Sequence, residues 1–261
     1  MRRWTDLVRP LVPVPARVWV ASARRTVRDL RSGARRMMAT GSEPSRAEAR
    51  EWPAHVSVTQ PLGQSAHVES KKHNLALAIR ELQDVRVGPE ELFSFWNLVG
   101  RPTKRRGFVP GRNLVQGRLE VSVGGGLCQL SGLTYLLALR GGLWVTERHA
   151  HSVDIYTEQT RFAPLGSDAT VAYGYKDLRF RNVLPFPIAL RFELGADTLT
   201  GSVCAPLPLE PCTVEFSLEE EADGRQVTTW VRRPGATEPD CLGVSFYRPF
   251  HKAPAHASFL P

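Results

Sequence analysis

The segment GGGLCQ at residues 124–129 decides how this chain is interpreted, together with ERHAHS at residues 147–152. Three consecutive glycines permit a tight turn and a close approach of the backbone to a neighbouring group. They present Cys128 where the apolar pattern of residues 129–140 predicts the start of a helix. A cysteine at a helix N-terminus lies at the positive end of the helix dipole, which favours the thiolate. The motif therefore predicts a reactive cysteine.

Spacing brings the second segment back toward this cysteine. A helix from Cys128 to residue 140 rises about 18 Å, and the diglycine at residues 141–142 reverses the chain. A strand to His149 then returns about 23 Å, with His151 just beyond. Alternation along a strand puts both histidines on one face. Asp154 has the opposite parity, so we expect Asp168, in the turn that follows, to orient a histidine.

Three interpretations of this arrangement stay open. In the first, Cys128 is a nucleophile, His149 or His151 is its base and Asp168 orients the base. Papain-type cysteine hydrolases share this layout of a cysteine at a helix start and a histidine on a strand. In the second, the cysteine and the His-x-His pair bind zinc. In the third, the cysteine is a buried packing residue and the histidines are satisfied by hydrogen bonds.

We also predict residues that contact a substrate near the cysteine. The glycine amides and the glutamine side chain are expected to stabilise an oxyanion. Aromatic side chains would line a groove for a sugar or peptide, with core packing as the favoured alternative, and a basic loop would hold a phosphate or carboxylate, with a solvated loop as the favoured alternative. The predicted set is Gly124, Gly125, Gly126, Gln129, Phe95, Trp96 and Arg101.

The basic character of the chain is confined to its first 36 residues. The 261 residues carry a net charge of +8, and residues 1–36 hold ten arginines against two aspartates. A helix over residues 16–30 would align Trp19, Ala23, Val27 and Leu30 on one face. This pattern predicts a peripheral helix on an anionic membrane surface, with a basic arm as the alternative. The charges of the remainder balance, so nucleic-acid binding is not expected.

Helices are expected before strands along the chain. Apolar periodicity predicts helices over residues 68–82 and 129–140 and an extended segment over 143–156. Strands rich in β-branched and aromatic residues are predicted at residues 169–175, 186–193, 198–205, 213–219 and 226–232. The fold class is α+β, with N-terminal helices and the cysteine-bearing helix packed on a mainly antiparallel sheet. The expected organisation is a basic amphipathic leader (1–38), a linker (39–66), a core domain (67–205) and a β-rich C-terminal extension of that domain (206–261).

The four cysteines include no CxxC pair, and a secretory signal is not recognisable. We therefore expect free thiols in a cytoplasmic protein, peripheral at the inner face of the membrane, with no cofactor.

Five ordered motifs resemble the VanW-like family over roughly residues 67–205. They are HNLALA (73–78), FSFW followed by VG (93–100), GGGLCQLS (124–131), ERHAHSVDIY (147–156) and PLGSDATVAYGYKDLRFRN (164–182). The family is named after an accessory member of vancomycin-type glycopeptide resistance gene clusters. The resemblance implies a bacterial protein with a link to the cell envelope, and it supplies no reaction.

Two functions follow as expectations beside the zinc alternative. One is a Cys–His thiol hydrolase or acyl-transferase that acts on a peptide-like or cell-envelope precursor substrate. The other is a non-catalytic envelope-associated binding or scaffold protein linked to glycopeptide resistance, which would hold its ligand with the glycine loop, the aromatics and the basic loop.

Overall fold

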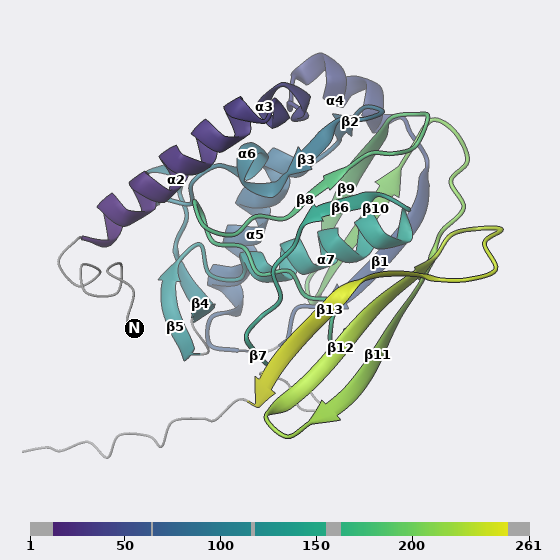
Figure 1. Cartoon of the computed structure of the whole chain (residues 1–261). Coiled ribbons are helices and arrows are strands. Elements are labelled where there is room, and N and C mark those ends of the chain that lie inside the picture. Colours follow the sequence, from purple (N-terminus) through teal and green to yellow (C-terminus); the bar gives the residue numbers. More distant parts are fainter. Residues whose placement is uncertain (1–12, 64, 116–117, 155–162, 250–261) are drawn as a thin grey trace, which may run out of the picture.

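Helix α7 (Leu127–Arg140) lies in the middle of the molecule, with sheets and helices packed around it (Figure 1). The computed structural model describes residues 13–63, 65–115, 118–154 and 163–249. Eleven residues of α7 are buried, because its sequence is apolar on nearly every side. The other helices are α2 (Val14–Arg31), α3 (Ala34–Met37), α4 (Glu43–Arg50), α5 (Val68–Leu82), α6 (Phe95–Val99) and the 3₁₀ turn η2 (Lys104–Arg106).

The first sheet is antiparallel and has the order β1-β10-β9-β2. Helix α7 packs against β1 and β10, and α5 packs against β9. Strand β1 forms one edge, where Thr59 Oγ1 lies 2.9 Å from Thr200 Oγ1 across the pair. The strands are β1 (Ala54–Pro61), β2 (Val85–Val87), β9 (Ile188–Leu194) and β10 (Thr198–Cys204).

The second sheet is a C-terminal meander with the order β11-β12-β13-β7. Its last pair is parallel and joins Arg248 to Val153, which brings the end of β13 beside the chain that follows the histidines. The strands are β7 (Val153–Asp154), β11 (Thr213–Glu221), β12 (Gly224–Arg232) and β13 (Asp240–Pro249).

Two smaller sheets complete the architecture, with the orders β3-β8-β6 and β4-β5. Strand β6 leads from α7 toward the histidines and pairs with β8. The strands are β3 (Leu92–Ser94), β4 (Pro110–Val115), β5 (Arg118–Val123), β6 (Trp144–Glu147) and β8 (Arg179–Arg181).

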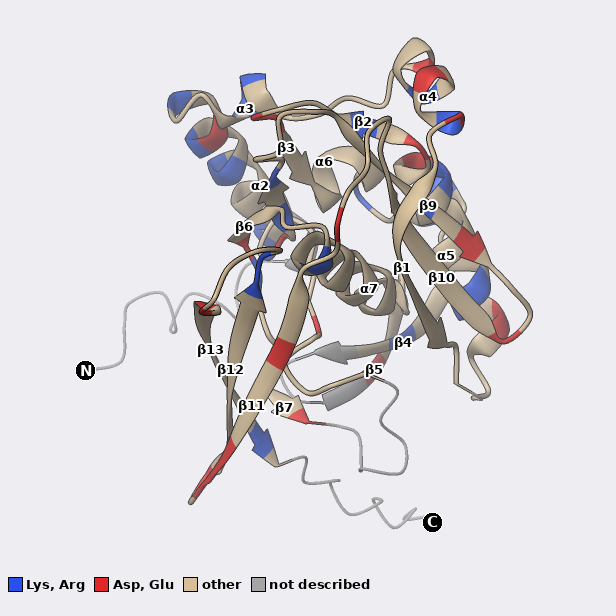
Figure 2. Cartoon of the chain, turned by 90° about the vertical axis from the view of Figure 1, so that its right-hand side faces the viewer, with Lys and Arg blue, Asp and Glu red and all other residues tan. Residues whose placement is uncertain are grey.

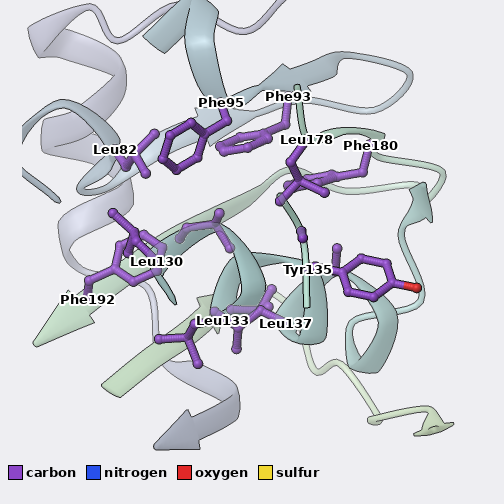
Figure 3. Close-up of a cluster of buried hydrophobic side chains, with 14 of the residues drawn as sticks. Leu82, Phe93, Phe95, Leu130, Leu133, Tyr135, Leu137, Leu178, Phe180 and Phe192 are labelled. Atoms are coloured by element: carbon purple, nitrogen blue, oxygen red, sulfur yellow. The ribbon is translucent and has the colours of Figure 1, made fainter. Parts of the chain in front are cut away.

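One continuous core joins α7 to α5 and the sheets, as Figure 3 shows. Leu130, Leu133 and Leu137 of α7 are fully buried. The rings of Phe93 and Phe180 stack at 4.4 Å between β3 and β8. This core fixes the position of α7, and with it the position of Cys128.

The predicted α+β class is confirmed, and so are most predicted elements. Helix α5 covers residues 68–82, and β9 to β12 occupy four of the five predicted strands. Helix α7 begins at Leu127 rather than at residue 129, so Cys128 lies in its first turn. Of the extended segment predicted over 143–156, β6 and β7 are strands, and residues 155–156 lie outside the described ranges.

Two predicted segments are wrong. The linker expected at residues 39–66 contains α4 and the edge strand β1, whose Ser57 and Thr59 lie on the solvent side of the sheet. The strand expected at 169–175 is irregular. Its backbone crosses α7 instead of joining a sheet, because Ala169 O accepts from Ser131 Oγ of α7 and Thr170 N donates to His149 O.

The basic N-terminal segment forms the long helix α2, which covers the helix predicted over residues 16–30. Figure 2 shows Lys and Arg gathered on α2 and α3. Among the described residues, none of the helices combines the length and apolarity that a membrane span requires.

Candidate functional site

Cys128 is held by the first turn of α7, immediately after the triple glycine. Gly126 caps the helix with a φ of 98°, a backbone conformation that residues with a side chain rarely adopt. The thiol is half-buried and packs against the core, and Sγ lies 4.0 Å from Val171 O. By comparison, Cys204 and Cys212 are buried and Cys241 is exposed.

The glycine turn is locked by close packing. A Cβ on Gly125 would lie 2.0 Å from the carbonyl carbon of Gly111, so only glycine fits. Asn74 Nδ2 donates to Gly125 O at 2.9 Å. The amides of Gly124 and Gly125 donate to the carbonyls of Val109 and Ser122. These two amides are engaged within the fold, so their predicted role as oxyanion donors is wrong, and what they do is position α7.

His151 contacts both the cysteine and an acid. His151 Nδ1 lies 2.6 Å from Asp168 Oδ2, and the same oxygen accepts the His151 backbone amide at 2.6 Å. Cys128 lies near enough to the His151 side chain to raise the pKa of the imidazole, while its Sγ contacts Val171 O at 4.0 Å. Because Nδ1 is occupied by Asp168, Nε2 is the ring nitrogen left to face the thiol. The structure thus joins Cys128, His151 and Asp168 in sequence.

Asp168 reaches this position because its loop rests on α7. Ser131 Oγ donates to Ala169 O at 2.5 Å. Gly132 faces the same loop, where an added Cβ would lie 3.6 Å from the backbone of Ser167, Asp168 and Ala169. The small residues on this side of α7 therefore admit the loop one turn beyond Cys128.

Two residues absent from the sequence-based prediction hold the Asp168 carboxylate. Arg148 Nη2 lies 3.0 Å from Asp168 Oδ1, and Arg148 also donates to the backbone carbonyls of Gly166 and Asp168 at 2.7 Å. Tyr247 Oη, on β13, donates to the same carboxylate oxygen. Asp168 therefore accepts from the histidine on one oxygen and from Arg148 and Tyr247 on the other.

The electrostatic interactions among these side chains favour the charged forms of His151 and Asp168. Burial alone would lower the pKa of His151, but the hydrogen bond to Asp168 and the proximity of Cys128 outweigh it and raise that pKa to about 10. Burial would raise the pKa of Asp168, yet His151, Arg148 and Tyr247 together hold it well below its usual range. Burial, followed by the charge of Asp168, raises the pKa of Tyr247, which stays protonated as a donor.

His149 belongs to a different network. Its Nε2 lies 3.0 Å from Glu147 Oε1, which also accepts the Asp177 amide at 3.0 Å. Glu147 pairs in turn with Arg25 of α2. The expectation that both histidines share one face is therefore wrong. Strand β6 ends at Glu147, so strict alternation stops before His149.

Among the remaining predicted substrate contacts, Gln129, Phe95 and Trp96 are engaged within the fold. Gln129 Nε2 donates to Pro61 O at 2.9 Å, so this donor is turned toward β1. Phe95 is fully buried, and the nearly buried Trp96 donates its indole N–H to Lys176 O. These aromatic residues form core, not a groove. Arg101 is exposed on the basic loop, and its role stays a prediction.

The zinc arrangement is not formed within the described parts of the chain. No group of three or more His, Cys, Asp or Glu side chains there has a geometry that could hold a metal ion. His149 and His151, the two expected ligands, are directed to Glu147 and to Asp168 respectively.

A cavity of about 490 Å³ lies between β6, β12 and β13, and none of Cys128, His151 and Asp168 lines it. Its lining includes Arg148, His149, Lys176 and Arg233. Arg148 thus contacts the Asp168 carboxylate and also lines the cavity.

A signal in the sequence marks one of the two missed residues. Arg148 lies inside the ERHAHS segment, next to His149, which is hydrogen-bonded to Glu147, and three residues before His151, which is hydrogen-bonded to Asp168. Tyr247 is far along the chain and comes close through the pairing of β13 with β12 and β7, which local spacing does not reveal.

Comparison with known proteins gives one family and two relatives. The family described as VanW like protein matches residues 70–204. The uncharacterized protein YoaR of Bacillus subtilis (strain 168) is 36% identical over 143 residues, covering 53% of this chain and 45% of that protein. The vancomycin B-type resistance protein VanW of Enterococcus faecalis (strain ATCC 700802 / V583) is 33% identical over 137 residues, covering 52% of this chain and 50% of that protein.

The chain spans about half the length of the curated relatives it matches. No solved structure matches it. The matched residues 70–204 contain Cys128, His151 and Asp168, whereas Tyr247 lies beyond them.

Proposed function

The chain belongs to the VanW-like family, and on this premise we propose that it is a cysteine-dependent hydrolase or acyl-transferase. The observation that carries the proposal is the placement of His151 between the Cys128 thiol and the Asp168 carboxylate. A nucleophile, a base and a group that orients the base are the parts that covalent acyl transfer requires.

Cys128 acts in this proposal as the nucleophile. The raised pKa of His151 keeps its ring protonated near neutral pH, which suits a thiolate–imidazolium pair. The thiolate attacks the carbonyl carbon of the substrate and forms a C–S bond and a tetrahedral oxyanion. As this intermediate collapses, the bond from carbon to the leaving nitrogen or oxygen breaks, and His151 gives the leaving group its Nε2 proton.

The second half of the reaction reverses these roles. His151 takes a proton from water, or from an acceptor hydroxyl or amine, and the acceptor atom bonds to the thioester carbon. The C–S bond then breaks and the thiolate returns. The amides of Leu127 and Cys128, in the first turn of α7, have no acceptor within the helix and are suited to stabilise the oxyanion.

A peptide-like or cell-envelope precursor is the proposed substrate class. Support comes from the family and from the relative that is named a vancomycin B-type resistance protein. The cavity lined by Arg148 would hold a part of the substrate away from the reacting carbonyl, and the Lys176 and Arg233 side chains on its lining favour an acidic group.

Alkylation with iodoacetamide, resolved by residue with mass spectrometry, tests the thiol. We expect Cys128 to react faster than the exposed Cys241. His151→Asn should slow Cys128 by about tenfold or more, since it removes the imidazolium. His149→Asn is the matched control and should change the rate by less than about twofold. Equal rates for Cys128 and Cys241, or equal effects of the two histidine variants, would overturn the proposal.

Binding without chemistry is the second candidate, and the cavity favours it. Under this alternative, Cys128→Ser leaves function intact while Lys176→Ala and Arg233→Ala weaken it. Trapping an acyl adduct on Cys128 with an activated peptide ester decides between the two candidates, because only the first one predicts the adduct.

A further inference from the structure

Helix α2 is attached to the body of the protein by its polar side. Arg179 donates to both carboxylate oxygens of Asp29, at 2.8 and 2.7 Å. Arg25 pairs with Glu147 and lies 3.6 Å from Asp177. The backbone of α2 also contacts the turn at Gly174, where an added Cβ would come within 3.1 Å of Val18 O. Asp29 and Arg25, two charged residues of the kind that a surface helix normally exposes, are therefore largely buried here.

The apolar side of α2 consequently faces solvent. Trp19 is 68% exposed and Leu30 is 60% exposed, and Val20 and Val27 are exposed beside them. At about 100° per residue, Trp19, Val20, Ala23, Val27 and Leu30 fall within one stripe. Except for Leu30, these residues line a shallow apolar groove together with the arginines beside them. We call these five residues the α2 stripe.

A row of arginines follows one border of the α2 stripe. Arg24, Arg28 and Arg31 are exposed and lie on the adjacent sector of the helix, at the edge of the same groove. Exposed tryptophan and aliphatic side chains next to a basic row match a bilayer surface, where the apolar groups enter the acyl boundary and the arginines contact anionic headgroups. Stripe and arginines therefore complement an acidic lipid surface in both polarity and charge.

We propose that α2 docks the protein on a membrane surface that contains anionic phospholipid. The α2 stripe inserts among the lipid headgroups, and Arg24, Arg28 and Arg31 contact the phosphates. The Asp29–Arg179 and Arg25–Glu147 pairs hold the helix so that this face stays outward. Because Glu147 also holds His149, the docked face is joined by direct contacts to the segment that carries His151.

Flotation with lipid vesicles tests the proposal on the full chain. Wild-type protein should bind vesicles of phosphatidylcholine mixed with phosphatidylglycerol, bind pure phosphatidylcholine far less, and be released by high salt. Val27→Glu with Leu30→Glu should weaken binding by about tenfold or more, since two charges enter the apolar layer. Arg24→Gln with Arg28→Gln and Arg31→Gln should weaken binding to the anionic vesicles by roughly a hundredfold, because each basic residue near such a surface strengthens binding about fivefold.

Matched variants separate docking from misfolding. Val121→Glu with Leu207→Glu places two charges at positions that are 57% and 52% exposed and lie outside α2, so binding should stay within about twofold of wild type. The melting temperature of each variant is compared with wild type, and Trp19→Glu serves as a second stripe variant if the first pair unfolds.

Four results would overturn the proposal. The first two are no wild-type binding to anionic vesicles at low salt and equal binding to both lipid mixtures. The third is a loss of vesicle binding in Val121→Glu with Leu207→Glu as large as in Val27→Glu with Leu30→Glu. The fourth is vesicle binding that appears only after residues 1–12 are removed. A wild-type dimer that Val27→Glu with Leu30→Glu converts to a monomer, with vesicle binding unchanged, would assign the face to a second copy of the chain. Vesicle binding is measured without substrate, so its outcome is independent of whether Cys128 is catalytic.

Discussion

His151 and Asp168 are joined twice through a single oxygen. The ring nitrogen Nδ1 and the backbone amide of His151 each lie 2.6 Å from Asp168 Oδ2. The backbone contact fixes the position of the His151 main chain, and the ring contact fixes the orientation of the imidazole plane. Arg148 and Tyr247 occupy the other carboxylate oxygen, so Asp168 has little freedom to move away. Such a preorganised pair is what a histidine base needs.

Stability should depend on pH through His151. Its pKa is raised in the folded protein to about 10 from an ordinary value of 6.5. The folded state therefore binds the proton more tightly, so the stabilisation is complete below about pH 6.5 and is lost as pH rises toward 10. We expect the free energy of unfolding of wild type to fall across this window, relative to His151→Asn, by on the order of 4 kcal/mol. Urea unfolding at several pH values measures the difference.

The comparison with His151→Asn is needed because Lys71 acts in the opposite direction. Burial, helped by the charge of Arg112, lowers the pKa of Lys71 to about 8 from 10.5, so its contribution to stability rises with pH above 8. That contribution is common to wild type and variant and cancels in the difference. Parallel curves for the two proteins between pH 6.5 and 10 would show that His151 is not held as a cation.

Local patterns in the sequence predicted the helices and most strands well, because apolar spacing in α5 and α7 records burial directly. The fixed lengths of a helix, a reversal and a return strand also predicted that His149 or His151 lies near Cys128, and the turn that follows suggested Asp168. These patterns failed where contacts between distant parts of the chain determine the structure. Strand β1 looks like a linker because its outward residues are polar, and Tyr247 is brought in by a sheet that forms over a long stretch of chain.

The Tyr247 hydroxyl should help to hold Asp168 beside His151 without being required for folding. Tyr247→Phe removes one donor to Asp168, so the carboxylate is held less firmly, and because its charge is then less compensated the pKa of His151 should rise. We expect a loss of about 1 kcal/mol in unfolding free energy. An NMR titration of the imidazole measures the pKa. Tyr175→Phe, at an exposed tyrosine, is the control and should leave the titration unchanged.

The Asp29–Arg179 pair should contribute more to stability than a surface pair. Both side chains are nearly buried and joined by two hydrogen bonds, so Asp29→Ala leaves part of a buried cation without its partner. Asp177 still pairs with Arg179, which limits the expected cost to about 2–3 kcal/mol. Asp240→Ala breaks an exposed pair with Arg233 and should cost less than about 1 kcal/mol. Urea unfolding compares the two variants, and equal costs would contradict the prediction.

Asp29→Ala should also loosen α2 before the body of the protein unfolds. Limited proteolysis under native conditions is expected to cut within residues 14–31 of this variant earlier than in wild type or Asp240→Ala. The same rate of cleavage in all three proteins would mean that the contacts of Arg25 and the Gly174 turn suffice to hold the helix.

Gly125, in the turn before Cys128, and Gly132, within α7, should respond in opposite ways to substitution by alanine. In Gly125→Ala, the new Cβ would lie 2.0–2.4 Å from backbone atoms of Gly111, and no flexible side chain can move aside. We expect a loss of at least about 2 kcal/mol, because the turn before Cys128 must shift. In Gly132→Ala, the new Cβ meets its nearest neighbours at an ordinary 3.6 Å within α7, so alanine should be neutral or stabilise the helix by about 0.5–1 kcal/mol. Thermal unfolding ranks the two variants, and alkylation of Cys128 should slow only in Gly125→Ala. A stable Gly125→Ala protein with an unchanged alkylation rate would mean that the glycine turn does not set the position of the thiol.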